Sequence, residues 1–457
     1  MIRRRTQRAK LSGWLVIALC LPACYRRPEG RSERASGPAA VVQPQANGGI
    51  DAGARDVLGL PAGRAVASKP KHLAAGSENT CALTSGGDVA CWGGNEYGQL
   101  GNGTTAPSAR PLVIPRLKAI EIAVGGEHAC ALTVQGEVMC WGDNRVGQVG
   151  SNTPTYYSPV PITVPRIRAA RIAIGEDHSC ALATDGAVSC WGQNAGRRGP
   201  DGQWAYGPAP VTISGLRAVA IAAGGFHTCA LLADGAVTCW GLNWFGQLGN
   251  GFGQLGDGTR ERSETPMPIN GLRAKAIAAG GHHTCALLLD GGVACWGMNR
   301  HGQLGSRSRD SAEPVVISGL HAVEIVASGE HTCARTVDGT VLCWGMNVYG
   351  ELGNGTNRYC SPIAPCVDVP PDLAKTRETG KFGERLAPLQ KPAAVPGLQA
   401  IELAAGAFHT CAITSGWTVV CWGSNASGQL GNDKMKESFV PTVVATPESQ
   451  NPRVAAP

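Results

Sequence analysis

The chain has 457 residues, of which 63 are glycine, 30 are proline and only 16% are charged. These proportions are typical of a turn-rich β protein, and a hydrophobic content of 43% excludes general disorder. The formal net charge is +6, but residues 1–35 alone carry +7. Subtracting this value leaves −1 for residues 36–457, so the globular part has no basic surplus for phosphates, and nucleic acid is not expected as a partner.

The N-terminus resembles an export signal. A basic segment is followed by a short apolar run, Trp14 to Leu21, which is too short to cross a bilayer as a helix. The run ends in Leu-Pro-Ala-Cys, which resembles a bacterial lipobox, so residues 1–23 are predicted to be a signal peptide and Cys24 the lipidated residue. An ordinary signal peptide with a chance cysteine is the alternative. Both interpretations place the protein outside the cytoplasm.

The residue after Cys24 is Tyr25 rather than aspartate, which by lipoprotein sorting rules favours the outer membrane if the source is Gram-negative. Residues 24–70 are rich in Ala, Gly, Pro, Arg and Ser and are predicted to form a flexible tether. Residues 446–457 are predicted to be a flexible tail. A cell-envelope lipoprotein attached to the membrane only through its lipid is therefore expected.

Residues 71–445 repeat one motif, best seen in residues 221–249. In that copy Cys229 and Cys239 flank a three-residue turn, and placing Gly235 in the left-handed conformation pairs the two cysteines across a β-hairpin. Their Cα atoms then approach within disulfide range. Seven disulfides are predicted at equivalent positions: Cys81–Cys91, Cys130–Cys140, Cys180–Cys190, Cys229–Cys239, Cys285–Cys295, Cys333–Cys343 and Cys411–Cys421.

The repeat length is near fifty residues, because the first cysteines of successive pairs are 49, 50, 49, 56, 48 and 78 residues apart. Each repeat offers four short strands, which in the fourth are expected near 219–223, 227–232, 236–240 and 267–269. A small four-stranded sheet cannot bury both faces alone, whereas seven sheets arranged radially can. The sequence therefore predicts an all-β, seven-bladed propeller, in which residues 439–445 and 72–76 together complete one closing blade.

The repeat reads A-G-x-x-H-T-C-A-L, then D-G-x-V, then C-W-G-x-N-x-x-G-Q-L-G-N-G. This pattern resembles the RCC1 repeat (regulator of chromosome condensation), whose members are seven-bladed propellers and interaction platforms. Its secreted bacterial relatives include a β-lactamase inhibitor. The paired cysteines and the export signal depart from the nuclear members, and they agree with each other because disulfides persist in oxidising compartments. Zinc ligation is the rival explanation, but nine intervening residues do not match zinc-site spacings.

Repetition argues that several chemically attractive residues are structural. A histidine precedes the first cysteine by two residues in six repeats, with Asn79 in the first, and a hydrogen-bonding role is expected for it rather than metal binding. The turn aspartates, Asp185, Asp234, Asp290 and Asp338, are spread over separate repeats, so a shared catalytic role is not expected. The tryptophan of C-W-G is expected to pack between blades. No catalytic residue, metal or cofactor is predicted.

Function is expected where the repeats differ, at the loop after C-W-G-x-N. Trp244, Arg145 and Arg300 are of the types enriched in binding hot spots. Tyr97, Phe245 and Tyr349, one position later, are expected to pack the loops. The third repeat replaces G-Q-L-G with a basic and aromatic segment, which adds Arg197, Trp204 and Tyr206 to the candidates, and the fourth repeat carries G-Q-L-G twice.

An insertion spans residues 357–392, and Cys360 and Cys366 are predicted to form an eighth disulfide at its base. A functional loop and a plain solvated excursion are both open interpretations of it.

The leading functional hypothesis is a non-enzymatic, monomeric platform that binds an unidentified protein or surface ligand through its loop tips. A propeller hydrolase or lyase acting on envelope polysaccharide is the alternative, which acids converging at one mouth of the ring would support. A structural component of an envelope assembly is the third possibility.

Overall fold

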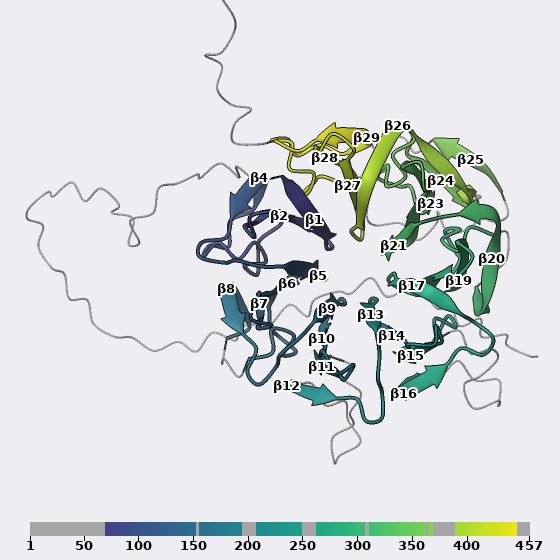
Figure 1. Cartoon of the computed structure of the whole chain (residues 1–457). Helices are drawn as coiled ribbons and strands as arrows, with labels where there is room; N and C mark the ends of the chain where they lie inside the picture. The colour runs from purple at the N-terminus through teal and green to yellow at the C-terminus, as the bar shows by residue number, and fades with distance from the viewer. Residues whose placement is uncertain are drawn as a thin grey trace, which may run out of the picture. The chain divides into compact units, whose positions relative to one another are not determined.

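In the computed structural model, residues 69–151, 155–193, 207–248, 262–306, 310–361, 364–368 and 389–445 are described. They lie in one compact unit and their regular secondary structure is entirely β (Figure 1). Among these residues no helix has the length and apolarity needed to cross a bilayer.

Five sheets are antiparallel four-stranded meanders in which neighbours in sequence are neighbours in the sheet. The first contains β1 (Pro70–Ala75), β2 (Asn79–Thr84), β3 (Val89–Gly93) and β4 (Ser108–Val113), and the second contains β5 (Glu121–Val124), β6 (His128–Leu132), β7 (Val138–Asp143) and β8 (Tyr157–Thr163). The third contains β9 (Arg171–Ile174), β10 (His178–Leu182), β11 (Val188–Gly192) and β12 (Gly207–Thr212). The fourth contains β13 (Ala220–Ala223), β14 (His227–Leu231), β15 (Val237–Gly241) and β16 (Ser263–Pro268), and the fifth contains β17 (Ala274–Ala279), β18 (His283–Leu288), β19 (Gly292–Gly297) and β20 (Ser311–His321).

The sixth and seventh repeats share one seven-stranded sheet. Its strands are β21 (Glu324–Ser328), β22 (His331–Arg335), β23 (Thr340–Gly345), β26 (Leu389–Ala405), β27 (His409–Thr414), β28 (Val419–Gly423) and β29 (Ser438–Val443). The 17-residue β26 pairs with β23 through its first part and with β27 through its last part. The expectation of seven separate blades is therefore wrong: five blades are separate sheets, because β26 runs on without a break where other repeats turn.

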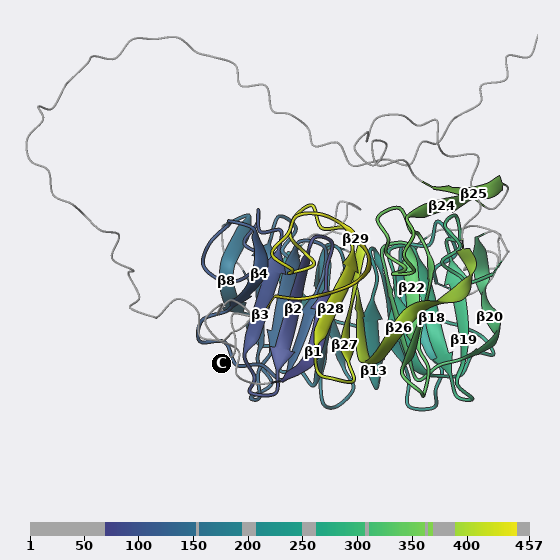
Figure 2. The same ribbon diagram turned by 90° about the horizontal axis from the view of Figure 1, so that it is seen from above.

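The sheets stand around a central axis like the blades of a propeller (Figures 1 and 2). The first strand of each repeat, such as β1, β5 or β9, faces the axis, and the last strand, such as β4, β8 or β12, lies at the rim (Figure 1). The hydrophobic core lies between neighbouring sheets. One cluster, for example, joins Leu231 and Val237 of the fourth repeat to Trp296 of the fifth, and all seven C-W-G tryptophans are at most 1% exposed.

The hairpin predicted for the fourth repeat is present. Cys229 pairs with Cys239 across β14 and β15, their Cα atoms are 4.1 Å apart, and Gly235 in the turn has φ 83°. The other six predicted hairpin disulfides are also formed. Cys360 and Cys366 fall in β24 (Arg358–Ser361) and β25 (Ala364–Asp368), a two-stranded hairpin whose side chains lie outside the described residues.

The predicted closing blade, shared by the two ends of the repeat region, is wrong. β29 stays on the rim of its own sheet beside β28, and β1 pairs with β2. The ring closes instead through contacts between sheets: the Ala407 amide donates to the Gly76 carbonyl at 2.9 Å, and the Leu73 amide donates to Glu402 Oε1 at 3.0 Å.

Candidate binding face

One end of the propeller carries the turn between the first two strands of each repeat and the described loops after C-W-G, and we call it the loop face. The turn between the first two strands and the loop after C-W-G meet there because the hairpin strands are antiparallel. In the fourth repeat, the Leu242 amide donates to the Phe226 carbonyl at 2.8 Å. The turns that contain the predicted turn aspartates lie at the opposite end, where Asp234 accepts a hydrogen bond from the Ala236 amide and Asp290 from the Gly292 amide.

The histidines bond across the boundaries between sheets. The Nε2 atom of each lies 2.7–2.9 Å from a hydroxyl of the next repeat, in the pairs His128–Ser179, His178–Thr228, His227–Thr284, His283–Thr332, His331–Thr410 and His409–Thr80. Burial lowers the pKa of His227 and His409 to about 3, so these rings are neutral. Asn79 does not fill the same role, because neither of its amide atoms has a partner and the next repeat offers Ala129 in place of a hydroxyl. The described residues contain no cluster suited to hold a metal ion.

In the described residues, six of the loops after C-W-G dock onto the following sheet. The indole Nε1 of Trp296 donates to the carbonyl of Gln247 at 2.9 Å, and Trp141, Trp191, Trp344, Trp422 and Trp92 donate in the same way to the loops before them. Leu248 is fully buried beside Trp296 in the same core cluster. The tryptophans are thus structural, as predicted, and the loops act as clamps between repeats.

Glycines narrow the axis of the ring to a cavity of about 50 Å³. A Cβ atom on Gly76 would lie 2.2 Å from the Gly125 carbonyl oxygen, so no side chain fits where the inner strands approach each other. Backbone hydrogen bonds run from repeat to repeat around this opening, for example from the Gly225 amide to the Gly280 carbonyl at 3.1 Å. The backbone around the axis is closely packed, and the remaining channel is too small for a ligand larger than a few water molecules.

A second variable position on the loop face was missed from the sequence. It is the residue directly before the histidine or Asn79, and its seven occupants are Glu78, Glu127, Asp177, Phe226, His282, Glu330 and Phe408. The differences among the seven repeats at this position are the sequence signal that marks it. The occupants divide the face into an acidic sector over repeats one to three and a mixed sector over repeats four to seven, which we call the aromatic sector because it holds two phenylalanines and a histidine beside the single acid Glu330.

In the acidic sector, Arg145 is held by carboxylates. Its Nη2 atom lies 2.7 Å from Asp143 and 3.1 Å from Glu127, and its guanidinium group lies 4.6 Å from the centre of the Tyr97 ring. Burial raises the pKa of Glu127 to about 7, although the nearby Arg145 acts to lower it. Arg145, predicted as a binding residue, therefore already has its charge compensated within the protein.

Glu176 lies at the mouth of the channel in the same sector. Its carboxylate accepts a hydrogen bond from Ser77 Oγ at 3.4 Å. The side chain keeps an exposed edge, but the protein around the carboxyl group raises its pKa to about 7, and the pKa of Asp177 is raised as well, chiefly by burial. Several acids therefore gather near one mouth of the ring.

The aromatic sector has the candidate Trp244 at its edge, 64% exposed. Phe245, next in sequence, packs edge-on against His282 with centroids 5.1 Å apart, and Arg300 lies 5.1 Å from the centre of the Phe245 ring. Tyr349 packs against Phe408 in the seventh repeat. Phe245 and Tyr349 thus support the loops as predicted, whereas Trp244 and Arg300 are exposed on the face.

His301 and Glu330 form an ion pair in this sector, with Nε2 and Oε2 2.5 Å apart. The pKa of Glu330 is lowered: burial would raise it, but the charge of His301 and its hydrogen bond more than offset this effect. The other predicted binding residues, Arg197, Trp204 and Tyr206, and the lipidation candidate Cys24 lie outside the described residues.

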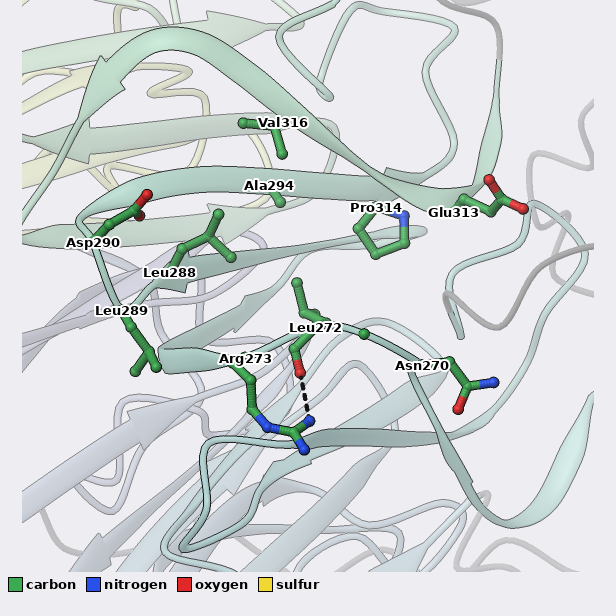
Figure 3. A pocket seen from close by; sticks show the side chains of 11 residues that line it. Asn270, Leu272, Arg273, Leu288, Leu289, Asp290, Ala294, Glu313, Pro314 and Val316 are labelled. Carbon is green, nitrogen blue, oxygen red and sulfur yellow. Dashed lines mark hydrogen bonds between the residues drawn. The ribbon is translucent and has the colours of Figure 1, made fainter.

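A wider hollow lies elsewhere, at the turn end of the fifth sheet (Figure 3). This groove has a volume of about 750 Å³ and is lined by Leu288, Leu289 and Val316 together with Arg273 and Asp290. Its charged groups serve local structure, because the Arg273 guanidinium donates to the Leu272 carbonyl at 3.1 Å and lies 3.6 Å from Asp234. The loop face, with its unlike repeats, is therefore the stronger candidate.

Residues 49–376 match the family described as the RCC1-like domain, and two RCC1 repeats match residues 400–429 and 418–456. The chain belongs to the RCC1-like family. Curated relatives from Arabidopsis thaliana align only locally: the mitochondrial RCC1 domain-containing protein RUG3 is 50% identical over 46 residues, and the ultraviolet-B receptor UVR8 is 41% identical over 64. These alignments span 10% and 13% of the relatives' lengths, and 9% and 13% of this chain.

Solved structures share the RCC1-like fold over most of the chain. Yeast RCC1 (Prp20), solved bound to Kap60, gives a TM-score of 0.66 at 24% identity, covering 79% of this chain and 84% of the other. A second structure of Prp20p from Saccharomyces cerevisiae, reported with its binding to Gsp1p and histones, gives 0.65 at 23% identity, with coverage of 84% and 89%. Human WBSCR16 gives 0.60 at 23% identity, with coverage of 79% and 95%. At this identity the likeness establishes the fold alone.

Proposed function

We propose that this protein is an exported, lipid-anchored, monomeric platform that binds another protein through its loop face and carries out no reaction of its own. The carrying observation is that the repeats agree at the buried His, Cys and Trp positions and differ at the loop-face positions. Trp244 is exposed and precedes Phe245, on whose ring Arg300 packs, and tryptophan and arginine are the residue types enriched at interface hot spots. The protein binding described for Prp20p supports a partner of this kind.

Export is supported by the cysteine chemistry. Seven disulfides lie inside the propeller, and such bonds persist in oxidising compartments. Anchoring through Cys24 rests on the sequence of the export signal. Replacement of Cys24 by alanine is expected to move the protein from the detergent phase to the aqueous phase of an envelope extract, and an unchanged distribution would exclude the lipid anchor.

Capture of a partner tests the binding face. Purified oxidised protein would be used as bait in envelope extracts, beside the variants Trp244→Ala and Trp417→Ala. Trp417 is the matched control because it is also exposed, at 44%, but lies in a turn at the opposite end of the ring. We expect Trp244→Ala alone to lose the partner. Equal capture by both variants would move the binding surface away from the loop face.

A polysaccharide hydrolase or lyase is the second candidate, favoured by the acids with pKa values near 7 at the channel mouth. If it is correct, the native protein cleaves an envelope polysaccharide, and Glu127→Gln and Glu176→Gln each abolish cleavage. Absence of any reducing-end release by the native protein would eliminate it.

A further inference from the structure

The turn end of the ring, opposite the loop face, exposes apolar side chains at the tips of several hairpin turns. Val134 is 74% exposed in the second repeat, and Trp417 is 44% exposed in the seventh. Lys69 lies at the same end, because the Ser85 amide in the first hairpin turn donates to the Lys69 carbonyl at 2.9 Å. The Nζ atom of Lys69 lies 5.0 Å from the centre of the Trp417 ring, so the two exposed side chains form one surface across the closing boundary of the ring.

Three exposed side chains at this end stand on left-handed backbone that glycine adopts without strain. Trp417 has φ 64°, and the equivalent residue in the other six repeats is a glycine with a positive φ, such as Gly136. Arg116 and Arg166 have φ 60° and 63°, at a position that is glycine in the next four repeats, as in Gly215. Large side chains therefore replace glycine in repeats seven, one and two, at a cost to the stability of the backbone. Strain of this kind points to a function for the side chains that cause it.

The first two repeats also carry positive charge at this end. Four exposed cations have no ion pair within the described part of the chain: Lys69, Lys71, Arg116 and Arg166. The acids of the two neighbouring hairpin turns are already paired. Asp88 lies 2.7 Å from Lys118 Nζ, and the carboxylate of Glu137 lies 3.1 Å from Arg168. We call Trp417, Val134 and the four unpaired cations the basic patch.

We propose that the basic patch lies against the surface of a bilayer that contains anionic phospholipids. Lysine and arginine near such a surface are attracted by its negative charge, and tryptophan and aliphatic side chains bind in the interfacial region beside the headgroups. Val134, exposed among the cations, favours a lipid surface over the phosphate backbone of a nucleic acid, which offers this side chain no apolar contact.

The course of the chain agrees with this orientation. β1 starts at the turn end, so the predicted tether joins the propeller beside the basic patch. The lipid anchor proposed at Cys24 would hold this end toward the membrane and leave the loop face directed away from it, open to a protein partner. The inference rests on the proposed anchor for this proximity alone, because the affinity of the patch for lipid is a property of the propeller.

The test measures co-sedimentation of the oxidised, unlipidated mature chain, residues 25–457, with vesicles of phosphatidylcholine alone or with about 30% phosphatidylglycerol. We expect binding to the anionic vesicles only, and loss of this binding at high salt. The triple variant Arg116→Gly, Arg166→Gly and Trp417→Gly introduces the glycines of the other repeats, so it should unfold at no lower temperature than the native chain. Its affinity for anionic vesicles is expected to fall about thirtyfold or more, because it loses two cations and the aromatic side chain.

The matched control is the double variant Trp244→Ala with Arg300→Ala, which removes a tryptophan and an arginine from the loop face and is expected to bind vesicles like the native chain. The proposal is overturned if the native chain does not bind anionic vesicles, or if the triple glycine variant binds them equally well. It is also overturned if the patch captures a protein from envelope extracts but binds no lipid. Because the probe carries no lipid, these results do not depend on the anchor at Cys24, which the phase distribution of Cys24→Ala tests separately.

Discussion

His227 Nε2 lies 2.8 Å from Thr284 Oγ1, in the neighbouring sheet, and this bond recurs at every boundary except the one between Asn79 and Ala129. The two residues of that boundary differ from the pattern together. We expect the double variant Asn79→His with Ala129→Thr to raise the free energy of unfolding by about 1 kcal/mol, because it satisfies a buried amide position with a hydrogen bond. Urea unfolding of both single variants and the double variant measures the coupling. Strictly additive effects would show that no bond forms.

Acid should destabilise the ring steeply. Burial lowers the pKa of four of the histidines to about 3 and of His178 and His331 to about 4, from 6.5. Below pH 6.5 the unfolded chain therefore binds protons that the folded protein excludes, so stability is full above pH 6.5 and is lost as pH falls toward the folded values. Each histidine contributes up to about 1.4 kcal/mol per pH unit. Urea midpoints between pH 7 and pH 5 test this, and His409→Gln should reduce the slope by about one proton.

Glu351 has the opposite dependence. It stands where five other repeats have glutamine, it is fully buried, and burial raises its pKa from 4.5 to about 7. The contribution of Glu351 to the free energy of unfolding is therefore full below pH 4.5 and lost as pH rises through 7. Glu351→Gln should change stability little at pH 4 and raise it by about 3 kcal/mol at pH 8. An equal effect at both pH values would mean that the carboxyl group does not titrate in this range.

The two tryptophans Trp240 and Trp296 form a natural pair for measuring the loop clamp. Trp296 donates to Gln247, whereas Trp240 has no acceptor. Replacement by phenylalanine removes similar packing in both, but only in Trp296→Phe does a buried carbonyl lose an indole donor. We expect Trp296→Phe to cost about 1–2 kcal/mol more than Trp240→Phe. Equal losses in thermal unfolding would show that the indole bond adds nothing measurable.

The hairpin disulfides should matter individually. Each closes a short loop, so replacing Cys229 and Cys239 together by alanine is expected to cost about 2–3 kcal/mol on the chain-entropy account. Denaturation without reductant measures this cost. A loss below about 0.5 kcal/mol would indicate that the hairpin persists in the unfolded chain.

The hairpins and the structural role of the repeated residues followed from the sequence for a physical reason. Turn geometry and alternation act over about ten residues, so Cys229, Gly235 and Cys239 contain all the information needed to pair them. The strands of the fourth repeat begin and end within one or two residues of the expected positions, except the last, which begins four residues earlier, at Ser263. Because equivalents of Asp234 and His227 recur in other repeats, the sequence assigned both residues structural roles.

The predictions that were wrong concern features that depend on contacts between repeats. The continuity of β26 and the separate edges of β1 and β29 are set by how neighbouring sheets pack, which no local pattern records. Asn79 was expected to replace histidine, and only the position of Ala129 in space shows why it does not. Arg145 is of a residue type enriched at binding hot spots, but only the structure shows that its charge is paired with Asp143.

The described residues show the loop clamp at six boundaries between repeats, and the last junction is one of them, since Trp92 donates to Gln429 as Trp296 donates to Gln247. The junction between the first and last repeats is therefore held by the same kind of hydrogen bond as the boundaries inside the chain. Since no strand is shared across that junction, joining the ends and cutting at another boundary that no strand crosses would exchange one such junction for another. Three boundaries would be different: the one before Trp240, whose indole has no acceptor, the one between Asn79 and Ala129, which lacks the histidine bond, and the one crossed by β26.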